Sequence, residues 1–158
     1  MTNYDPDRAV HVPATISNFW VFPGETEQCP LARQLVRVAL RDRTSIVDDA
    51  ELVISELFGN GCRHTRSGEP GGTLGVSVSA LAAGPALVSV TDEGPTRGDR
   101  ASGRRYWPTV KPMTPDTLGW RGLHLVATIA DDWGHTPTDG LGLTVWAAFT
   151  YTLPLQQP

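Results

Sequence analysis

Hydrophobic residues along the chain change between helical and alternating spacing in an order that limits the possible folds. Residues 16–22 are rich in β-branched and aromatic side chains and stop at Pro23-Gly24, which predicts a strand followed by a turn. Residues 31–41, with Pro30 at their start, and residues 45 to about 66 have apolar positions at helical spacing. Residues 73–80 and 86–92 have apolar side chains at alternate positions, which predicts two strands that form a hairpin joined at Gly84-Pro85.

The C-terminal part of the sequence begins with a long segment that has no hydrophobic period. Loops as long as residues 95–118 are uncommon inside compact domains and are usually lids or binding loops. A third helix is predicted from residue 119 to about 132. Residues 143–153 form a strand that is apolar on both faces and is expected to be central in the sheet.

The order is therefore strand, helix, helix, strand, strand, loop, helix, strand, strand. This order predicts an α+β fold, a two-layer sandwich in which helices cover one face of a mixed, mostly antiparallel sheet. The second helix is expected to be capped by Ser45, with Asp48 and Asp49 in its first turn. The length suits one domain, which we expect to span residues 15–154 after a flexible N-terminus at residues 1–14.

Charge and composition exclude several classes of function. The net charge of -4 argues against nucleic acid as the main partner, because phosphate backbones are bound through basic fields. No apolar run suits a membrane span or a signal peptide, and Cys29 and Cys62 form no C-x-x-C pair. We therefore expect a cytoplasmic protein that does not bind a membrane. Residues 95–118 contain five basic and two acidic residues, a net of +3, and such a loop can close over a polyanion.

Three sets of polar residues are candidates for a site. On the second predicted helix, Glu56, Asn60 and His64 lie four residues apart along the edge of an apolar stripe; a solvated helix flank is the alternative interpretation. Asp92 ends a strand whose alternate residues point into the core, and a plain turn is the alternative. Gly119 and Gly122 open the third helix, where free N–H groups favour a phosphate, although an ordinary loop-to-helix junction has the same pattern.

Taken in order, these segments resemble the GHKL ATP-binding superfamily, which includes gyrase and the sensor histidine kinases. Within it, the chain resembles the anti-sigma-factor serine/threonine kinases of actinobacteria, with their histidine-kinase-like ATPase domain. Residues 51–64 are similar to the N box of the family, residues 90–94 to its first glycine box and residues 119–126 to its second. Residues 142–147 resemble the final strand of the nucleotide site. The resemblance covers nearly the whole chain from Phe19 to Phe149 and implies the Bergerat fold.

The resemblance implies a role for each candidate residue. Asn60 would coordinate a Mg²⁺ ion that bridges the ATP phosphates, and Glu56 would be the general base or would orient the attacking hydroxyl. Asp92 would accept a hydrogen bond from the adenine amino group, helped by Thr144 through a water molecule. The other nucleotide-binding residues implied by the resemblance are His64, Gly94, Gly119, Arg121, Gly122 and Leu123.

The same resemblance implies the cofactors ATP and Mg²⁺ and two functional hypotheses. The first is a kinase that phosphorylates an anti-anti-sigma protein of the STAS type, or holds a sigma factor, with a homodimer left open. The alternative is a non-catalytic, nucleotide-dependent interaction module that sequesters a partner. Glu56 favours the kinase. The module is favoured by Thr96, which stands where the family often has glycine, and by Gly59 and Gly61, which flank Asn60.

Overall fold

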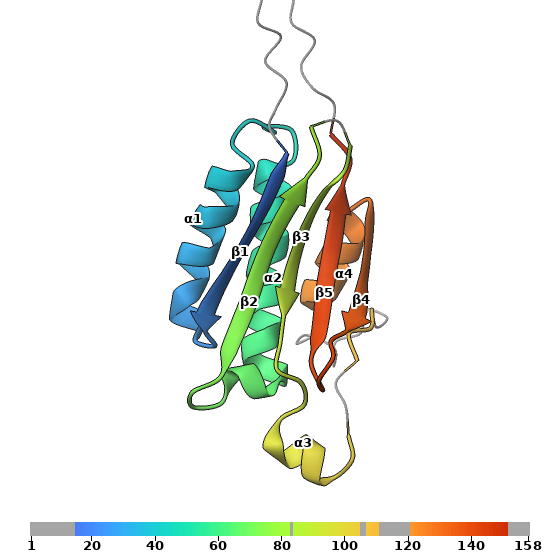
Figure 1. Ribbon diagram of the computed structural model, residues 1–158. Coiled ribbons are helices and arrows are strands. Elements are labelled where there is room, and N and C mark those ends of the chain that lie inside the picture. The colour runs from blue at the N-terminus through green and yellow to red at the C-terminus, as the bar shows by residue number, and fades with distance from the viewer. Residues whose placement is uncertain (1–14, 83, 105–106, 111–120, 152–158) are drawn as a thin grey trace, which may run out of the picture.

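A computed structural model describes residues 15–82, 84–104, 107–110 and 121–151 (Figure 1). Its strands are β1 (Ile16–Pro23), β2 (Thr73–Ala80), β3 (Ala86–Thr91), β4 (Asp132–Pro137) and β5 (Leu143–Phe149). Its α-helices are α1 (Cys29–Ala39), α2 (Val47–His64), α3 (Arg97–Ala101) and α4 (Arg121–Ile129). Two short 3₁₀ helices, Thr26–Gln28 and Arg66–Gly68, precede α1 and follow α2.

The strands form one sheet in the order β1-β2-β3-β5-β4, and helices α1, α2 and α4 lie on one of its faces (Figure 1). The expected two-layer α+β fold is confirmed. All four strand pairings are antiparallel, so the described part of the sheet contains no parallel pair. Strand β5 lies inside the sheet, between β3 and β4, while β3 holds the middle position.

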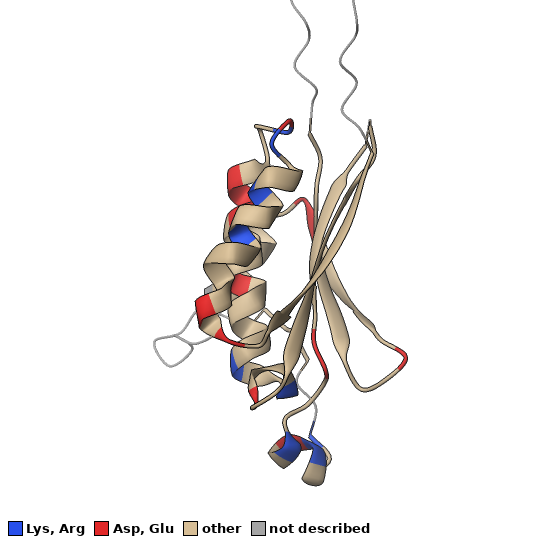
Figure 2. Cartoon of the chain, turned by 60° about the vertical axis from the view of Figure 1, so that its left-hand side comes forward, with Lys and Arg blue, Asp and Glu red and all other residues tan. Residues whose placement is uncertain are grey.

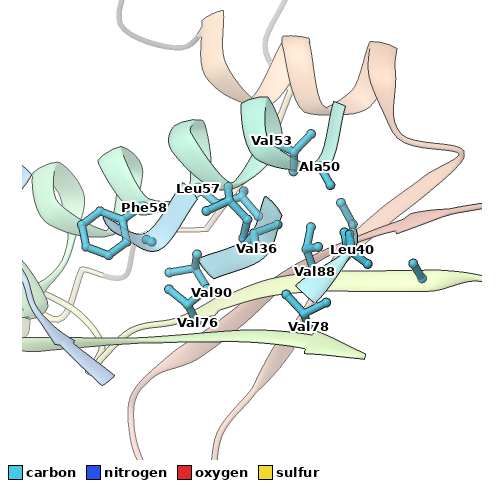
Figure 3. Close-up of a cluster of buried hydrophobic side chains, with 14 of the residues drawn as sticks. Val36, Leu40, Ala50, Val53, Leu57, Phe58, Val76, Val78, Val88 and Val90 are labelled. Carbon is cyan, nitrogen blue, oxygen red and sulfur yellow. The ribbon is translucent and has the colours of Figure 1, made fainter. Parts of the chain in front are cut away.

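The core lies between the sheet and α2. Alternate residues of β2 and β3, such as Val76 and Val90, point toward Val53, Leu57 and Phe58 of α2 (Figure 3), and all five are buried. Each large aliphatic or aromatic side chain buried in this way contributes about 1.5–3 kcal/mol. The apolar stripe predicted for this helix is therefore confirmed.

The start of α2 differs from the prediction. The cap expected from Ser45 is wrong, because α2 begins at Val47 and its N-terminal cap is Ile46, which offers no side-chain hydrogen bond. Asp48 and Asp49 do lie in the first turn. The Arg37 guanidinium on α1 contacts Asp48 at 2.6 Å and so links the two helices at their exposed edge.

The third predicted helix is shorter than expected, since α4 ends at Ile129 and the chain enters β4 at Asp132. The final strand, predicted over residues 143–153, ends at Phe149. No helix of the described ranges is long and apolar enough to span a bilayer.

The expected lid, residues 95–118, contains a short helix that hydrophobic spacing did not reveal. The Thr96 hydroxyl caps α3 by accepting a hydrogen bond from the Asp99 N–H at 3.1 Å, and it donates to the Asp99 carboxylate at 2.9 Å. The Glu69 carboxylate holds the helix in place, accepting from the backbone N–H of Arg97 at 2.8 Å. Helix α3 and its basic residues extend beyond the end of the sheet (Figure 2). The rest of the predicted lid, residues 105–106 and 111–118, lies outside the described residues.

Candidate functional site

Asp92 follows the last residue of β3 and is held in place by the backbone. Its Oδ1 atom accepts hydrogen bonds from the N–H groups of Gly94 at 2.6 Å and Leu143 at 3.2 Å. Among the described residues, its Oδ2 atom has no hydrogen-bond partner. Burial raises the pKa of this carboxyl above its ordinary value, an effect that the two N–H donors partly offset. One oxygen of a partly buried carboxylate is therefore available to a ligand.

Gly94 and Gly142 allow the chain after β3 to lie directly against the chain before β5. Gly94 has φ +97°, and a Cβ atom there would lie 2.6 Å from the carbonyl oxygen of Leu141. A Cβ at Gly142 would overlap the carbonyl oxygen of Asp92. Real Cβ atoms do not come this close to a backbone oxygen, so both positions require glycine. Gly94 thus lies against the backbone of Leu141, and its predicted place in the nucleotide-binding set stays a prediction.

Two neighbouring hollows adjoin Asp92. The first lies between α2, β3, α4 and β5, and its lining includes Asn60, Asp92 and Leu123. The second is lined by Asp92 and Gly94 together with the chain just before β5. The structure thus brings Asn60, Asp92, Gly94 and Leu123 to two neighbouring hollows, and their binding of a nucleotide stays a prediction. Leu123 is 1% exposed and forms part of the hydrophobic core beside the hollow.

Asn60 is buried, and its side chain has a partner that the sequence analysis did not name. Its Oδ1 atom accepts a hydrogen bond of 3.0 Å from Nη2 of Arg63, one turn further along α2. An arginine has only donors, so the oxygen end of the amide must face it. A Cβ at Gly59 would lie 3.0 Å from Nη1 of Arg63, so this glycine leaves room for the guanidinium. The three-residue spacing of Asn60 and Arg63 is the signal that identifies such a pair.

Glu56 lies one turn before Asn60 on α2 and faces the start of α4. A Cβ atom at Gly122 would overlap its Oε2 atom, so the carboxylate lies directly against the Gly122 backbone. The first turn of a helix has free N–H groups and the positive end of the helix dipole, both of which favour a carboxylate. The structure brings Glu56 and Gly122 together, but neither lines the two hollows, and their predicted roles stay predictions. Gly119 and the side chain of Arg121 lie outside the described residues.

This contact leads to a test with a matched control. We expect Gly122→Ala to push the Glu56 carboxylate out of its place with little change in melting temperature, because Oε2 is the far end of a flexible side chain that can move aside. Gly140→Ala is the control, because nothing lies within 4 Å of a Cβ atom there. Thermal unfolding measures both variants. A crystal structure of Gly122→Ala in which the Glu56 carboxylate has not moved would contradict the packing of Glu56 on Gly122.

Thr144 is not brought to Asp92. It pairs with Thr91 across β3 and β5, and the two hydroxyls lie 2.8 Å apart. Successive strand residues point to opposite faces. Thr144 therefore lies on the face away from the helices, while the buried Leu143 and Val145 face them. The backbone of Leu143, not the hydroxyl of Thr144, is what contacts Asp92. The strand register therefore contradicts the expectation that Thr144 helps Asp92 to bind the base.

His64 closes α2 and lines neither hollow. Burial, and to a smaller extent the neighbouring Arg63 charge, lower the pKa of its imidazole below the ordinary value. A neutral imidazole is therefore favoured at neutral pH. The expectation that His64 binds the nucleotide stays a prediction.

Thr65 and Ser67 are site residues that the sequence analysis missed. The Thr65 hydroxyl donates to the carbonyl oxygen of Gly61 at 2.7 Å and accepts from the N–H of Ser67 at 3.2 Å. The Ser67 hydroxyl accepts from the N–H of Glu93 at 2.9 Å. Both side chains are at most 3% exposed. They connect the end of α2, next to Asn60, to the chain just after Asp92. Local Ser/Thr-to-backbone bonding after a helix is the signal that could have identified them.

The residues at the hollows suit a nucleotide and its metal ion. The Oδ2 atom of Asp92 can accept from an amino group, and the amide oxygen of Asn60 is a hard ligand of the kind Mg²⁺ takes in small numbers. A family model described as histidine kinase-like ATPase domain matches residues 22–149, which is most of the chain. No curated protein matches the sequence. The chain therefore belongs to the histidine kinase-like ATPase domain family, whose members bind ATP, typically with Mg²⁺.

Proposed function

We propose that the chain is a serine/threonine protein kinase that phosphorylates an anti-anti-sigma protein of the STAS type and holds a sigma factor through the same domain, alone or as a homodimer. The contact between Glu56 and Gly122 carries the proposal. It sets a carboxylate at the start of α4, one turn from Asn60. Phosphoryl transfer needs positioned groups and charge neutralisation rather than covalent work by the protein, so a carboxylate at this place suits it.

Each residue then has a defined task. Asp92 accepts a hydrogen bond from the adenine amino group through Oδ2. Asn60 would hold the Mg²⁺ ion, which supplies neutralisation of the phosphate charge. Glu56 accepts the proton of the partner's serine hydroxyl while that oxygen forms a bond to the γ-phosphorus, the bond to the β-γ bridging oxygen breaks, and ADP leaves.

The experiment titrates the purified chain with ATP in the presence and absence of Mg²⁺ and then follows labelled phosphate to a STAS partner. The parent should bind Mg-ATP and transfer phosphate to serine. Asn60→Ala should stay folded and bind Mg-ATP roughly tenfold or more weakly, since losing an interaction with a charged group costs about 1.5–3 kcal/mol. Unchanged Mg-ATP affinity in Asn60→Ala would refute the assignment of Asn60.

The second candidate function is the non-catalytic, nucleotide-dependent module that sequesters a partner. The hydrogen bond from Arg63 to Asn60 supports it, because the guanidinium places a positive charge beside the oxygen that a Mg²⁺ ion would need. A chain that binds ATP and a partner but transfers no phosphate to any STAS protein would favour the module over the kinase.

A further inference from the structure

The chain after α3 returns to the hollows beside Asp92. Pro108 is buried there and lines the same hollow as Asn60 and Asp92. The neighbouring Trp107 lines the second hollow, beside Gly94. Residues 107–108, between the two glycine boxes, thus lie beside Asp92, the residue expected to bind the adenine base.

Little space remains around these two residues. Each hollow has a cavity volume of about 10 Å³, which is the room that one water molecule needs. A purine ring is many times larger than that. Yet Asp92, whose Oδ2 atom has no hydrogen-bond partner among the described residues, lines both hollows. Trp107 lines the second hollow with it, and Pro108 lines the first.

Trp107 also contacts strand β4, outside the site. The ring of Trp107 packs on the imidazole of His135 in β4, with ring centroids 5.6 Å apart and planes inclined by 47°. Trp107 keeps 44% of its surface exposed, while Pro108 is buried. An aromatic contact on one side and a buried proline on the other give the segment a defined position.

We propose that Trp107 and Pro108 occupy the place of the adenine base, so that these two residues compete with the nucleotide and set its affinity. The proposal rests on the ATP site described above. A ligand that binds only the open form has an apparent dissociation constant raised by the inverse of the open fraction. Removing the competing side chains raises that fraction and tightens binding. Residues that merely stacked on a bound base would have the opposite effect.

The binding test compares the parent with Trp107→Ala/Pro108→Ala by calorimetric titration with Mg-ATP. The double variant should bind more tightly, by roughly tenfold if the open form is about a tenth of the parent population. The matched control is Val110→Ala, which trims a side chain 39% exposed in the same segment that lines neither hollow. It should bind like the parent. Weaker or unchanged affinity in the double variant would overturn the competition.

A second measurement needs no nucleotide. The N–H groups of Gly94 and Leu143 that donate to Asp92 lie beside the two hollows, so their hydrogen exchange should be faster in the double variant than in the parent. Exchange as slow as in the parent would show that the pair does not fill the site. Faster exchange with no ATP binding by either protein would refute the ATP site itself and the competition with it. ATP binding by both at equal affinity would refute the competition alone.

Discussion

Asp92→Asn is expected to lose most of its preference for ATP over GTP and, at neutral pH, to be more stable than the parent. An asparagine oxygen can still accept from Gly94 and Leu143, so the local backbone is retained. Its second group is an NH₂ donor, however, which faces the donor amino group of adenine. Leaving such donors unpaired costs about 1–3 kcal/mol, or roughly a tenfold to hundredfold loss of ATP affinity. Competition titrations with ATP and GTP measure the change.

The gain in stability follows from the sign of the pKa shift. Burial raises the pKa of Asp92 above its ordinary 3.8. A carboxyl whose pKa is raised in the folded state stabilises the fold fully at pH values below its pKa in the unfolded state. This stabilisation is lost as the pH rises through its pKa in the folded state. At neutral pH the ionised carboxylate therefore destabilises the fold, and a neutral amide removes that penalty. Melting temperatures should favour Asp92→Asn at pH 7, and the difference should shrink below about pH 4.

Asp131→Asn is the control, because the pKa of Asp131 is shifted in the direction opposite to that of Asp92. The Asp131 carboxylate accepts from the backbone N–H and the hydroxyl of Thr150, which lowers its pKa, and it lies away from the hollows. Its replacement should leave nucleotide preference unchanged and should not raise the melting temperature at pH 7. An Asp92→Asn protein that keeps its ATP preference would exclude Asp92 as the base-reading residue.

Much of the fold followed from hydrophobic spacing, and the errors arose where spacing carries no information. Periodicity placed α2 and its buried face correctly, because packing against the sheet selects apolar residues every three or four positions. It missed α3, whose single turn buries no side chain and depends on the cap from Thr96 to Asp99. A Thr-x-x-Asp pattern is a capping signal, so the sequence did contain that information.

The sequence predicts a site residue well where the position of that residue depends only on its own helix or strand. Asn60 and Asp92 reach one hollow because α2 packs on β3. The order of elements implied helices on one face of the sheet but not which strand each helix covers. The placement of Thr144 failed because a shift of one residue in a strand reverses the face of a side chain, and sequence alone does not fix the register. The contact of Pro108 with the hollow depends on tertiary packing, which no local pattern encodes. The contact of Arg63 with Asn60, by contrast, follows from their three-residue spacing on one helix and was overlooked.

Glu56→Gln is expected to separate nucleotide binding from phosphate transfer. Glutamine retains the shape of the side chain against Gly122 and removes only the charge. Glu56 is not among the residues that line the two hollows, so ATP affinity should stay within about twofold of the parent. A positioned general base contributes roughly 10²–10⁴-fold, and transfer to a STAS partner should fall by that amount. Calorimetry and the labelled-phosphate assay measure the two quantities on the same preparation.

The control is Glu51→Gln, five residues earlier on the same helix. Glu51 accepts from the Arg37 guanidinium at 2.6 Å on the side of α2 that contacts α1. Losing an ion pair at this exposed edge should lower stability by at most about 1 kcal/mol and leave transfer unchanged. If Glu56→Gln transfers phosphate as fast as Glu51→Gln, Glu56 is not the base. If Glu56→Gln instead loses ATP affinity in step with transfer, Glu56 supports the nucleotide rather than the reaction, and the module becomes the better description of this chain.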